Sequence, residues 1–400
     1  MTSLPELDSP SPGTTAWRAL LALAVVFVLL ATTGWTAIRH QQSSDPRAVA
    51  LAAWQQGTID GRPLPDPHAR PRPLGRFFDS LTAAQRHHLA RRYPLVVGNL
   101  NGAPVGLRYE ANRYALATAR DVERRRMRDD RLTPLGRAEA GRRMHRYESL
   151  LRRDRQILAF DPAGPGRVAE VFGDLARAEH VAIVVPGVDT NALTFERTER
   201  VYRAPVGMAR ALYRAERSLE PDGENAVIAW ADYTAPVGTG LDAATGKLAA
   251  EGALRLRALA NALPARSRTT LVCHSYGSVV CGVAARDLSP NVTDIAVAGS
   301  PGMRAEHASD LGSAARVWAM RDADDWIEDV PNLEVGGLGH GADPVSPGFG
   351  ARVLSAERAE GHSGYFVPGT DSLLNFAKVS IGRLASVSCA DGDDCAVGRT

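Results

Sequence analysis

Lysine is almost missing from this sequence, which has it only at Lys247 and Lys378, so arginine supplies nearly all of the 47 basic side chains. The 45 acidic side chains nearly balance them and leave a formal net charge of +2. This balance argues against a protein that binds nucleic acid through its overall charge. Cysteine is scarce as well, with four residues and no pair at the CxxC spacing of zinc sites. We expect neither a metal nor an organic cofactor.

One long uncharged run is present near the start. Residues 19–38, ALLALAVVFVLLATTGWTAI, are long enough at about 1.5 Å per residue to cross a bilayer core of roughly 30 Å. We predict a single transmembrane helix there, after a tail over residues 1–18. A secretory signal peptide is the alternative, although Glu6 and Asp8 do not suit its basic first region. The even number of cysteines favours an oxidising compartment, so we expect the body of the protein at the cell membrane, on its extracytoplasmic side.

Two segments of different character follow. Residues 39–76 contain GRPLPDPHARPRPLGR, whose prolines and arginines do not suit a regular core element, and we predict a linker. Residues 77–178 are predicted to form a helical segment that packs on the core. A capping box at Thr82–Gln85 opens one of its helices.

Short apolar runs alternate with helical periodicity over residues 179–385. The strand-length runs include HVAIVVPG, NAVIAWADY, TTLVCHS, DIAVAGSPG and RVWAM. Continuous apolar strands separated by helices indicate an α/β fold, with a mostly parallel sheet covered on both faces. A tail over residues 386–400 follows, in which Cys389 and Cys395 could close a small disulfide loop.

The stretch LVCHSYGS places Ser275 where a strand ends and a helix begins. This is the position of the nucleophile in the Gly-x-Ser-x-Gly motif, whose small flanking residues permit a strained turn. Gly277 fits the motif, whereas Cys273 replaces its first glycine. A bridge from Cys273 to Cys281 across this junction is conceivable, although four cysteines allow three pairings.

A serine nucleophile needs a base and an orienting carboxylate, which in this topology follow in the order serine, acid, histidine. Three acids come after the run RVWAM. We prefer Asp325 because the apolar pair after it would anchor its loop, Asp324 is nearly equivalent, and Asp322 is expected to be a solvated turn residue. His362, in the loop before the last helix, is the expected base, and His340 is the alternative.

Acyl transfer also needs N–H donors for the oxyanion that forms on the substrate. One donor should be the amide after the nucleophile, at Tyr276. The other should lie in the loop PGVDT after an early strand, where Val188 is our candidate and Gly187 permits a close approach of the backbone.

The chain resembles an actinobacterial α/β-hydrolase family long catalogued as a domain of unknown function. The likeness runs from about residue 77 to 385 and is carried by stretches such as LTAAQRHHLARRYPLVVGNLNGAPVGLRYEANRYAL, ILAFDPAGPGRVAEVFGD, LVCHSYGSVVCG, GGLGHGADPVSPGFGARV and GHSGYFVPGTDSLLNFA. The resemblance implies an α/β-hydrolase core preceded by a helical segment, with Ser275 as nucleophile and His362 as base. It supplies no substrate.

These features together predict a membrane-anchored serine hydrolase that cleaves a carboxylic ester, lipid-like or of the cell envelope, through Ser275, His362 and Asp325. An acyltransferase or a peptidase would use the same residues. The glycine-bearing segment 234–246 could serve as a lid that excludes water, which would favour transfer. A binding protein on a catalytically silent hydrolase fold is the alternative outside the enzymes.

Overall fold

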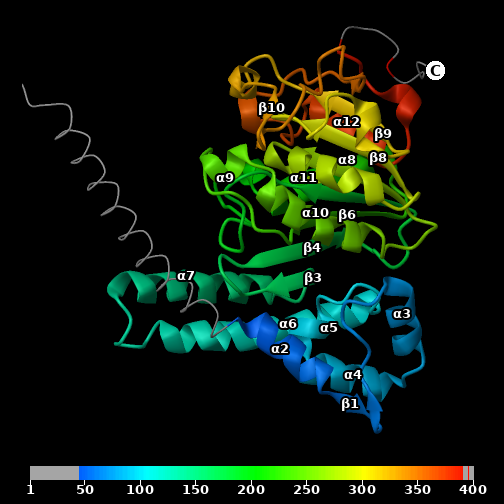
Figure 1. Cartoon of the computed structure of the whole chain (residues 1–400). Coiled ribbons are helices and arrows are strands. Elements are labelled where there is room, and N and C mark those ends of the chain that lie inside the picture. The colour runs from blue at the N-terminus through cyan, green and yellow to red at the C-terminus, as the bar shows by residue number, and fades with distance from the viewer. Residues whose placement is uncertain (1–44, 391–394, 396–400) are drawn as a thin grey trace, which may run out of the picture. The chain divides into compact units, whose positions relative to one another are not determined.

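The computed structural model describes residues 45–390 and residue 395, and its centre is an eight-stranded sheet in the order β12-β9-β8-β7-β5-β6-β4-β3 (Figure 1). The strands from β12 to β6 run parallel, and β4 is antiparallel to both β6 and β3. The strands are β3 (Gln156–Asp161), β4 (Arg167–Gly173), β5 (His180–Val185), β6 (Asn225–Ala231), β7 (Arg268–His274), β8 (Val292–Ala298), β9 (Arg316–Met320) and β12 (Arg352–Val353).

Helices cover both faces of this sheet, as the continuous apolar strands predicted. Along β5, Val181 and Ile183 pack in one apolar cluster, while Ala182 and Val184 pack in another, because alternate side chains point to opposite faces. The first cluster includes side chains of α10 (Lys247–Ala260) and α11 (Tyr276–Ala284). The second includes side chains of α8 (Pro205–Leu219) and α12 (Asp371–Ser380). The mostly parallel, doubly covered sheet is that of the α/β-hydrolase fold.

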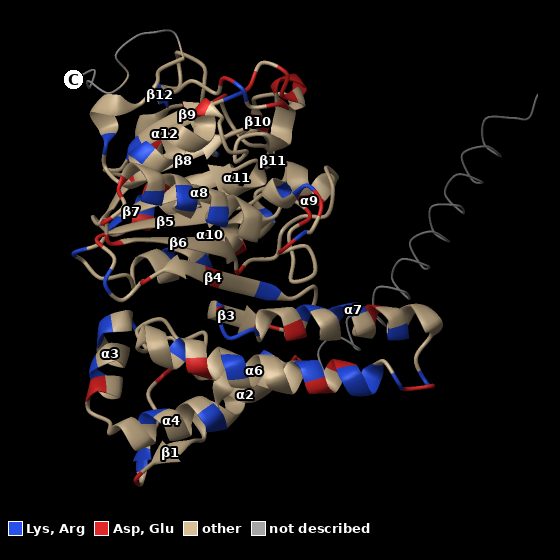
Figure 2. Cartoon of the chain, turned by 180° about the vertical axis from the view of Figure 1, so that it is seen from behind, with Lys and Arg blue, Asp and Glu red and all other residues tan. Residues whose placement is uncertain are grey.

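The segment predicted as helical over 77–178 is helical only in part. Its helices are α4 (Ala83–Arg92), α5 (Pro94–Val97), α6 (Val105–Arg126) and α7 (Pro134–Leu150), and the predicted capping box at Thr82 forms. Both basic and acidic residues occur along α6 and α7, which lie side by side (Figure 2). Residues 156–173 instead form β3 and β4, which extend the sheet beyond the predicted core boundary at residue 179. Their apolar runs are too short for periodicity to separate a strand from a buried helix.

The linker predicted over 39–76 is wrong for its described residues. They form α2 (Pro46–Gln55), a hairpin of β1 (Thr58–Ile59) and β2 (Arg62–Pro63), and α3 (Pro71–Asp79). Trp54 and Leu74 are buried in an apolar cluster with residues of α4, α5 and α6. Among the prolines that suggested a linker, Pro71 begins a helix, where a missing N–H costs no intrahelical hydrogen bond.

The transmembrane helix predicted over 19–38 lies outside the described residues. Within the described part of the chain, no helix is long and apolar enough to cross a membrane.

Two disulfides join Cys273 to Cys281 and Cys389 to Cys395, so the bridge across the serine junction and the tail loop both form.

Candidate active site

Ser275 is the single residue between two elements. β7 ends at His274 and α11 begins at Tyr276. Ser275 has φ 55° and ψ −130°, a backbone conformation that residues other than glycine rarely adopt. Such a turn at the carboxyl edge of a parallel sheet lifts the serine hydroxyl above the strands.

The backbone packs so closely around this turn that two glycines are required. A Cβ atom on Gly277 would lie 2.2 Å from the carbonyl oxygen of Val185. A Cβ on Gly187 would lie 2.7 Å from the Cβ of Ser275. Cys273 stands where the motif has its first glycine, and it is bonded to Cys281 in α11. The substitution thus exchanges a small residue for a covalent link across the turn.

His362 connects Ser275 to Asp325. Its Nε2 lies 2.8 Å from the Oγ of Ser275, and its Nδ1 lies 2.8 Å from Oδ1 of Asp325. His362 stands in the short 3₁₀ helix Gly361–Ser363 after β12, and Asp325 follows β9. Three loops at one edge of the sheet thereby bring together residues that are 87 and 37 positions apart in the chain.

The carboxylate of Asp325 is held in place by further donors. The N–H of Ile327 donates to Oδ1 at 3.0 Å, and the hydroxyl of Tyr365 donates to Oδ2 at 2.5 Å. Burial by itself would raise the pKa of Asp325, but the hydrogen bonds from His362, Tyr365 and Ile327 lower it below its usual value. Asp325 is therefore a carboxylate at neutral pH and can stabilise a positive charge on His362.

The two other acids of this loop lie elsewhere. Asp324 is exposed, and its N–H donates to Oδ1 of Asp322 at 3.2 Å, so Asp325 is the acid that faces His362. Asp322 is not the solvated turn residue that we expected. Its Oδ1 accepts the N–H of Gly361 at 2.8 Å and so ties the acid loop to the loop of His362.

His340, the alternative base, lies on the wall of the neighbouring cavity. Its Nε2 lies 2.7 Å from the carbonyl oxygen of Ala243, and its ring meets that of Tyr276 edge-on at 5.7 Å. Burial lowers its pKa, which favours the neutral ring that donates to a carbonyl oxygen. The histidine that contacts Ser275 is His362.

Three residues of the site were not found from the sequence. Nε2 of His274 lies 2.6 Å from the carbonyl oxygen of His362 and so supports the loop of His362. Burial, and to a smaller extent the charge of His362, lowers the pKa of His274 to about 3. The ring of His274 is therefore neutral. Tyr365 holds Asp325, and the ring of Trp326 lies 4.6 Å from that of His362. Each lies one to three positions from a predicted site residue, so closeness in the sequence was the one signal that could have found them.

The two predicted oxyanion donors flank Ser275. Tyr276 is the first residue of α11, where the N–H groups have no acceptor within the helix. Val188 follows Gly187 and lines the same cavity as Ser275 and Tyr276. Their positions suit the role, which remains a prediction.

A cavity of about 450 Å³ opens beside Ser275. Its wall is mainly apolar and comes from the loop after β9 and from the segments around residues 239–244 and 330–340. The lining side chains that are apolar include Val188, Ala244, Ile327, Val330, Leu333 and Leu338. A cavity of this size and character suits an acyl chain or a similar apolar group.

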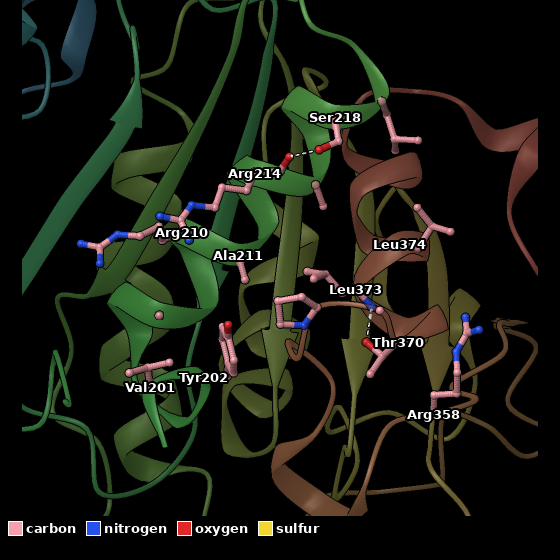
Figure 3. A pocket seen from close by; sticks show the side chains of 15 residues that line it. Val201, Tyr202, Arg210, Ala211, Arg214, Ser218, Arg358, Thr370, Leu373 and Leu374 are labelled. Atoms are coloured by element: carbon pink, nitrogen blue, oxygen red, sulfur yellow. Dashed lines mark hydrogen bonds between the residues drawn. The ribbon is translucent and has the colours of Figure 1, made fainter. Parts of the chain in front are cut away.

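A larger cavity of about 690 Å³ lies between α8 and α12, and Figure 3 shows its lining. Three arginines, Arg210, Arg214 and Arg358, stand among apolar side chains such as Leu373. Ser275, His362 and Asp325 do not line it. Size alone therefore does not identify the site, and the smaller cavity is the one that adjoins a hydrogen-bonded serine and histidine.

Comparisons with known proteins agree with this fold. Residues 161–335 match a family model described as alpha/beta hydrolase. An uncharacterized protein of Mycobacterium tuberculosis is 27% identical over 388 residues, covering 80% of this chain and 57% of the relative. One of Mycobacterium bovis is 33% identical over 146 residues, covering 35% of this chain and 54% of the relative. The resemblance to an actinobacterial α/β-hydrolase family is confirmed, and the chain spans little more than half the length of these relatives.

Two solved structures are also similar. An a/b serine hydrolase without lid from Xanthomonas campestris has 21% identity and a TM-score of 0.29, covering 44% of this chain and 74% of its own. An alpha-beta serine hydrolase homologue from Coxiella burnetii has 11% identity and a TM-score of 0.32, covering 58% and 98%. The family match and the sheet topology support the α/β-hydrolase fold and a hydrolase.

Proposed function

We propose that this chain is a serine hydrolase that cleaves carboxylic esters through an acyl-enzyme, with Ser275, His362 and Asp325 as its catalytic triad. The observation that carries the proposal is the position of His362, which lies 2.8 Å from both Ser275 Oγ and Asp325 Oδ1. The strained backbone of Ser275 supports it, because such backbone strain is concentrated at active sites, where it is part of the mechanism.

In the first half of the reaction, Oγ of Ser275 attacks the acyl carbon while Nε2 of His362 takes the hydroxyl proton. Asp325 holds Nδ1–H and stabilises the imidazolium. The amides of Tyr276 and Val188 would donate to the oxyanion. His362 then gives its proton to the leaving alcohol, whose bond to the acyl carbon breaks.

In the second half, His362 takes a proton from a water molecule, which attacks the acyl-enzyme. The acyl carbon releases Ser275, which recovers its proton from His362, and a carboxylic acid leaves. The apolar cavity favours an acyl ester over a peptide, because it offers few polar side chains to a peptide backbone. Transfer of the acyl group to an alcohol in place of water would use the same residues.

We also propose that the 19–38 segment tethers the protein to the cell membrane, with the hydrolase domain on the extracytoplasmic side. Two disulfides in the described residues support this, because such bonds persist in oxidising compartments.

Labelling of the full chain with a fluorophosphonate probe tests the proposal, since the probe reacts with activated serines. We expect labelling of the wild type and none of Ser275→Ala or His362→Ala. Ser309→Ala and His307→Ala, two exposed neighbours, are the matched controls and should label normally. A folded wild-type protein that does not label would refute the proposal. Labelling that is lost in His340→Ala but kept in His362→Ala would identify His340 as the base.

A further inference from the structure

Large apolar side chains that are exposed to solvent gather around one opening of the molecule. Ten such side chains are exposed in the described residues; three of them line the cavity beside Ser275, and two more stand two positions to either side of Thr239, which also lines it. These five, the apolar rim, are Val237 (84% exposed), Leu241 (78%), Trp326 (48%), Leu333 (50%) and Leu338 (49%). Single exposed apolar residues are ordinary, but a cluster around a cavity marks a surface that binds something.

The rim comes from two segments that lie against each other. Trp326, Leu333 and Leu338 line the cavity directly, and Thr239, which stands between Val237 and Leu241, lines it too. The segments meet through a β-bridge between Thr245 and Leu338. They carry the short helix α9 (Leu241–Ala244) and the hairpin of β10 (Glu334–Val335) and β11 (Leu338–Gly339).

The rim is also tied to the loop that holds the proposed oxyanion donor Val188. The N–H of Asp189 donates to the carbonyl oxygen of Pro236 at 2.8 Å, and the N–H of Gly238 donates to Oδ1 of Asp189 at 2.8 Å. Val237 lies between these two contacts. A surface pressed against the rim would therefore meet the opening to the serine.

Charge around the rim is negative. Besides the buried Asp325, residues 237–247 and 324–340 contain five carboxylates and one lysine, namely Asp242, Asp324, Glu328, Asp329 and Glu334 against Lys247. Arg304 pairs with Glu334, and Arg321 lies 3.6 Å from Glu328, but Asp242, Asp324 and Asp329 stay exposed. Figure 2 shows acidic residues gathered beside β10. Such a rim repels an anionic surface within a Debye length of about 8 Å, whereas an uncharged apolar surface meets no such barrier.

We propose that the apolar rim docks this protein on the surface of an uncharged lipid ester, from which the substrate passes directly into the cavity beside Ser275. The inference rests on the proposed ester hydrolysis and adds its substrate class, a neutral lipid ester in an aggregate. A protein partner is less suited, because the rim surrounds the opening to an apolar cavity that a lipid chain can enter and a folded surface cannot.

Hydrolysis of tributyrin, an uncharged triester, below and above its solubility limit tests the docking. We expect the full-length wild type to accelerate sharply above the limit. In Val237→Ser/Leu241→Ser, the rate above the limit should fall roughly tenfold or more, because two exposed apolar anchors are lost, while the rate below it stays unchanged. Leu254→Ser is the matched control, since Leu254 is 60% exposed on α10 and is not part of the rim. An equal acceleration in all three proteins would overturn the inference.

The N-terminal segment is common to these proteins, so it cannot explain a difference between them. Charge is tested by adding an anionic phospholipid to the tributyrin surface. We expect a lower rate that salt restores, and a higher rate would contradict the repulsion.

A second measurement does not depend on catalysis. The Ser275→Ala chain is crosslinked to an emulsion of a diacylglycerol that carries a photoreactive diazirine in its acyl chain. Crosslinks in residues 234–247 and 326–340 would support docking even if the wild type hydrolyses no ester, in which case the proposed function alone fails. If the wild type hydrolyses esters but neither segment is crosslinked, the docking inference fails and the hydrolase stands.

Discussion

Asp325 and Asp324 are neighbours in the chain with opposite surroundings, and this contrast gives a prediction at the scale of single residues. Asp325 is buried against His362, whereas Asp324 is exposed. Asp325→Asn should lower kcat for a soluble ester by about 10⁴-fold, the loss seen when the triad aspartate of a serine protease becomes asparagine. Asp324→Asn should leave kcat nearly unchanged. Steady-state kinetics of the two variants decide the matter, and an equal loss in both would count against our assignment.

The sequence narrowed the acid to two positions and gave only a slight preference for Asp325 over Asp324. Adjacent residues in a loop point in different directions, and their directions depend on contacts made far away in the chain. Here the deciding contacts come from Tyr365, which donates to Asp325, and from Asp322, which accepts the N–H of Gly361. Both contacts cross between loops that are about 40 residues apart, so no local pattern reveals them.

At the scale of elements, the Cys273–Cys281 disulfide links β7 to α11 on either side of Ser275. Replacing both cysteines with alanine should lower the free energy of unfolding by about 2–3 kcal/mol, the chain-entropy value for a loop this short. It should also lower kcat/KM roughly 10- to 100-fold, because the strained turn then positions Ser275 less accurately. Urea denaturation and ester kinetics give the two quantities.

The second disulfide provides the control for this prediction. Cys389 and Cys395 close a loop of similar length, with a sequence separation of 6 compared with 8. Replacing them should cost comparable stability without reducing the rate of ester hydrolysis. If both double variants hydrolyse esters equally well, the bridge at the turn has no role in positioning the serine.

Elements were predictable where their signals were long or chemically distinct. The strands from β5 to β9 are apolar runs with helices between them, and the capping box at Thr82 begins a helix as expected. The failures were β3 and β4, taken as helical, and the helices α2 and α3, taken as a linker. In the first case a short apolar run suits either element, and in the second a proline read as a breaker stands at a helix start.

At the scale of the whole molecule, the sheet explains why the order of the motifs was informative. Val188, Ser275, Asp325 and His362 follow β5, β7, β9 and β12, all parallel strands of one sheet. The carboxyl ends of parallel strands meet at one edge, so residues after different strands come together there. Sequence order therefore predicted which loops meet, while the exposure of the apolar rim depends on how the loops fold and was not foreseen.

Glu216, in the last turn of α8, gives a prediction for the stability of the whole fold. Glu216 is 1% exposed, and its Oε1 has no hydrogen-bond partner among the described residues. Burial raises its pKa well above the usual value, so the folded chain binds this proton more tightly than the unfolded chain. The resulting contribution to stability is full below the unfolded pKa and is lost as the pH rises through the folded pKa.

Glu216→Gln removes the titrating group while keeping its shape. The variant should match the wild type in free energy of unfolding at pH 4 and exceed it at pH 8, where the wild type must either bury a charge or hold a proton against the solution. Glu251→Gln, at an exposed position of α10, should show no such growing difference. Urea denaturation of the three proteins at both pH values measures this. A variant that is less stable than the wild type at pH 8 would show that the carboxylate of Glu216 is ionised and has a partner that stabilises its charge.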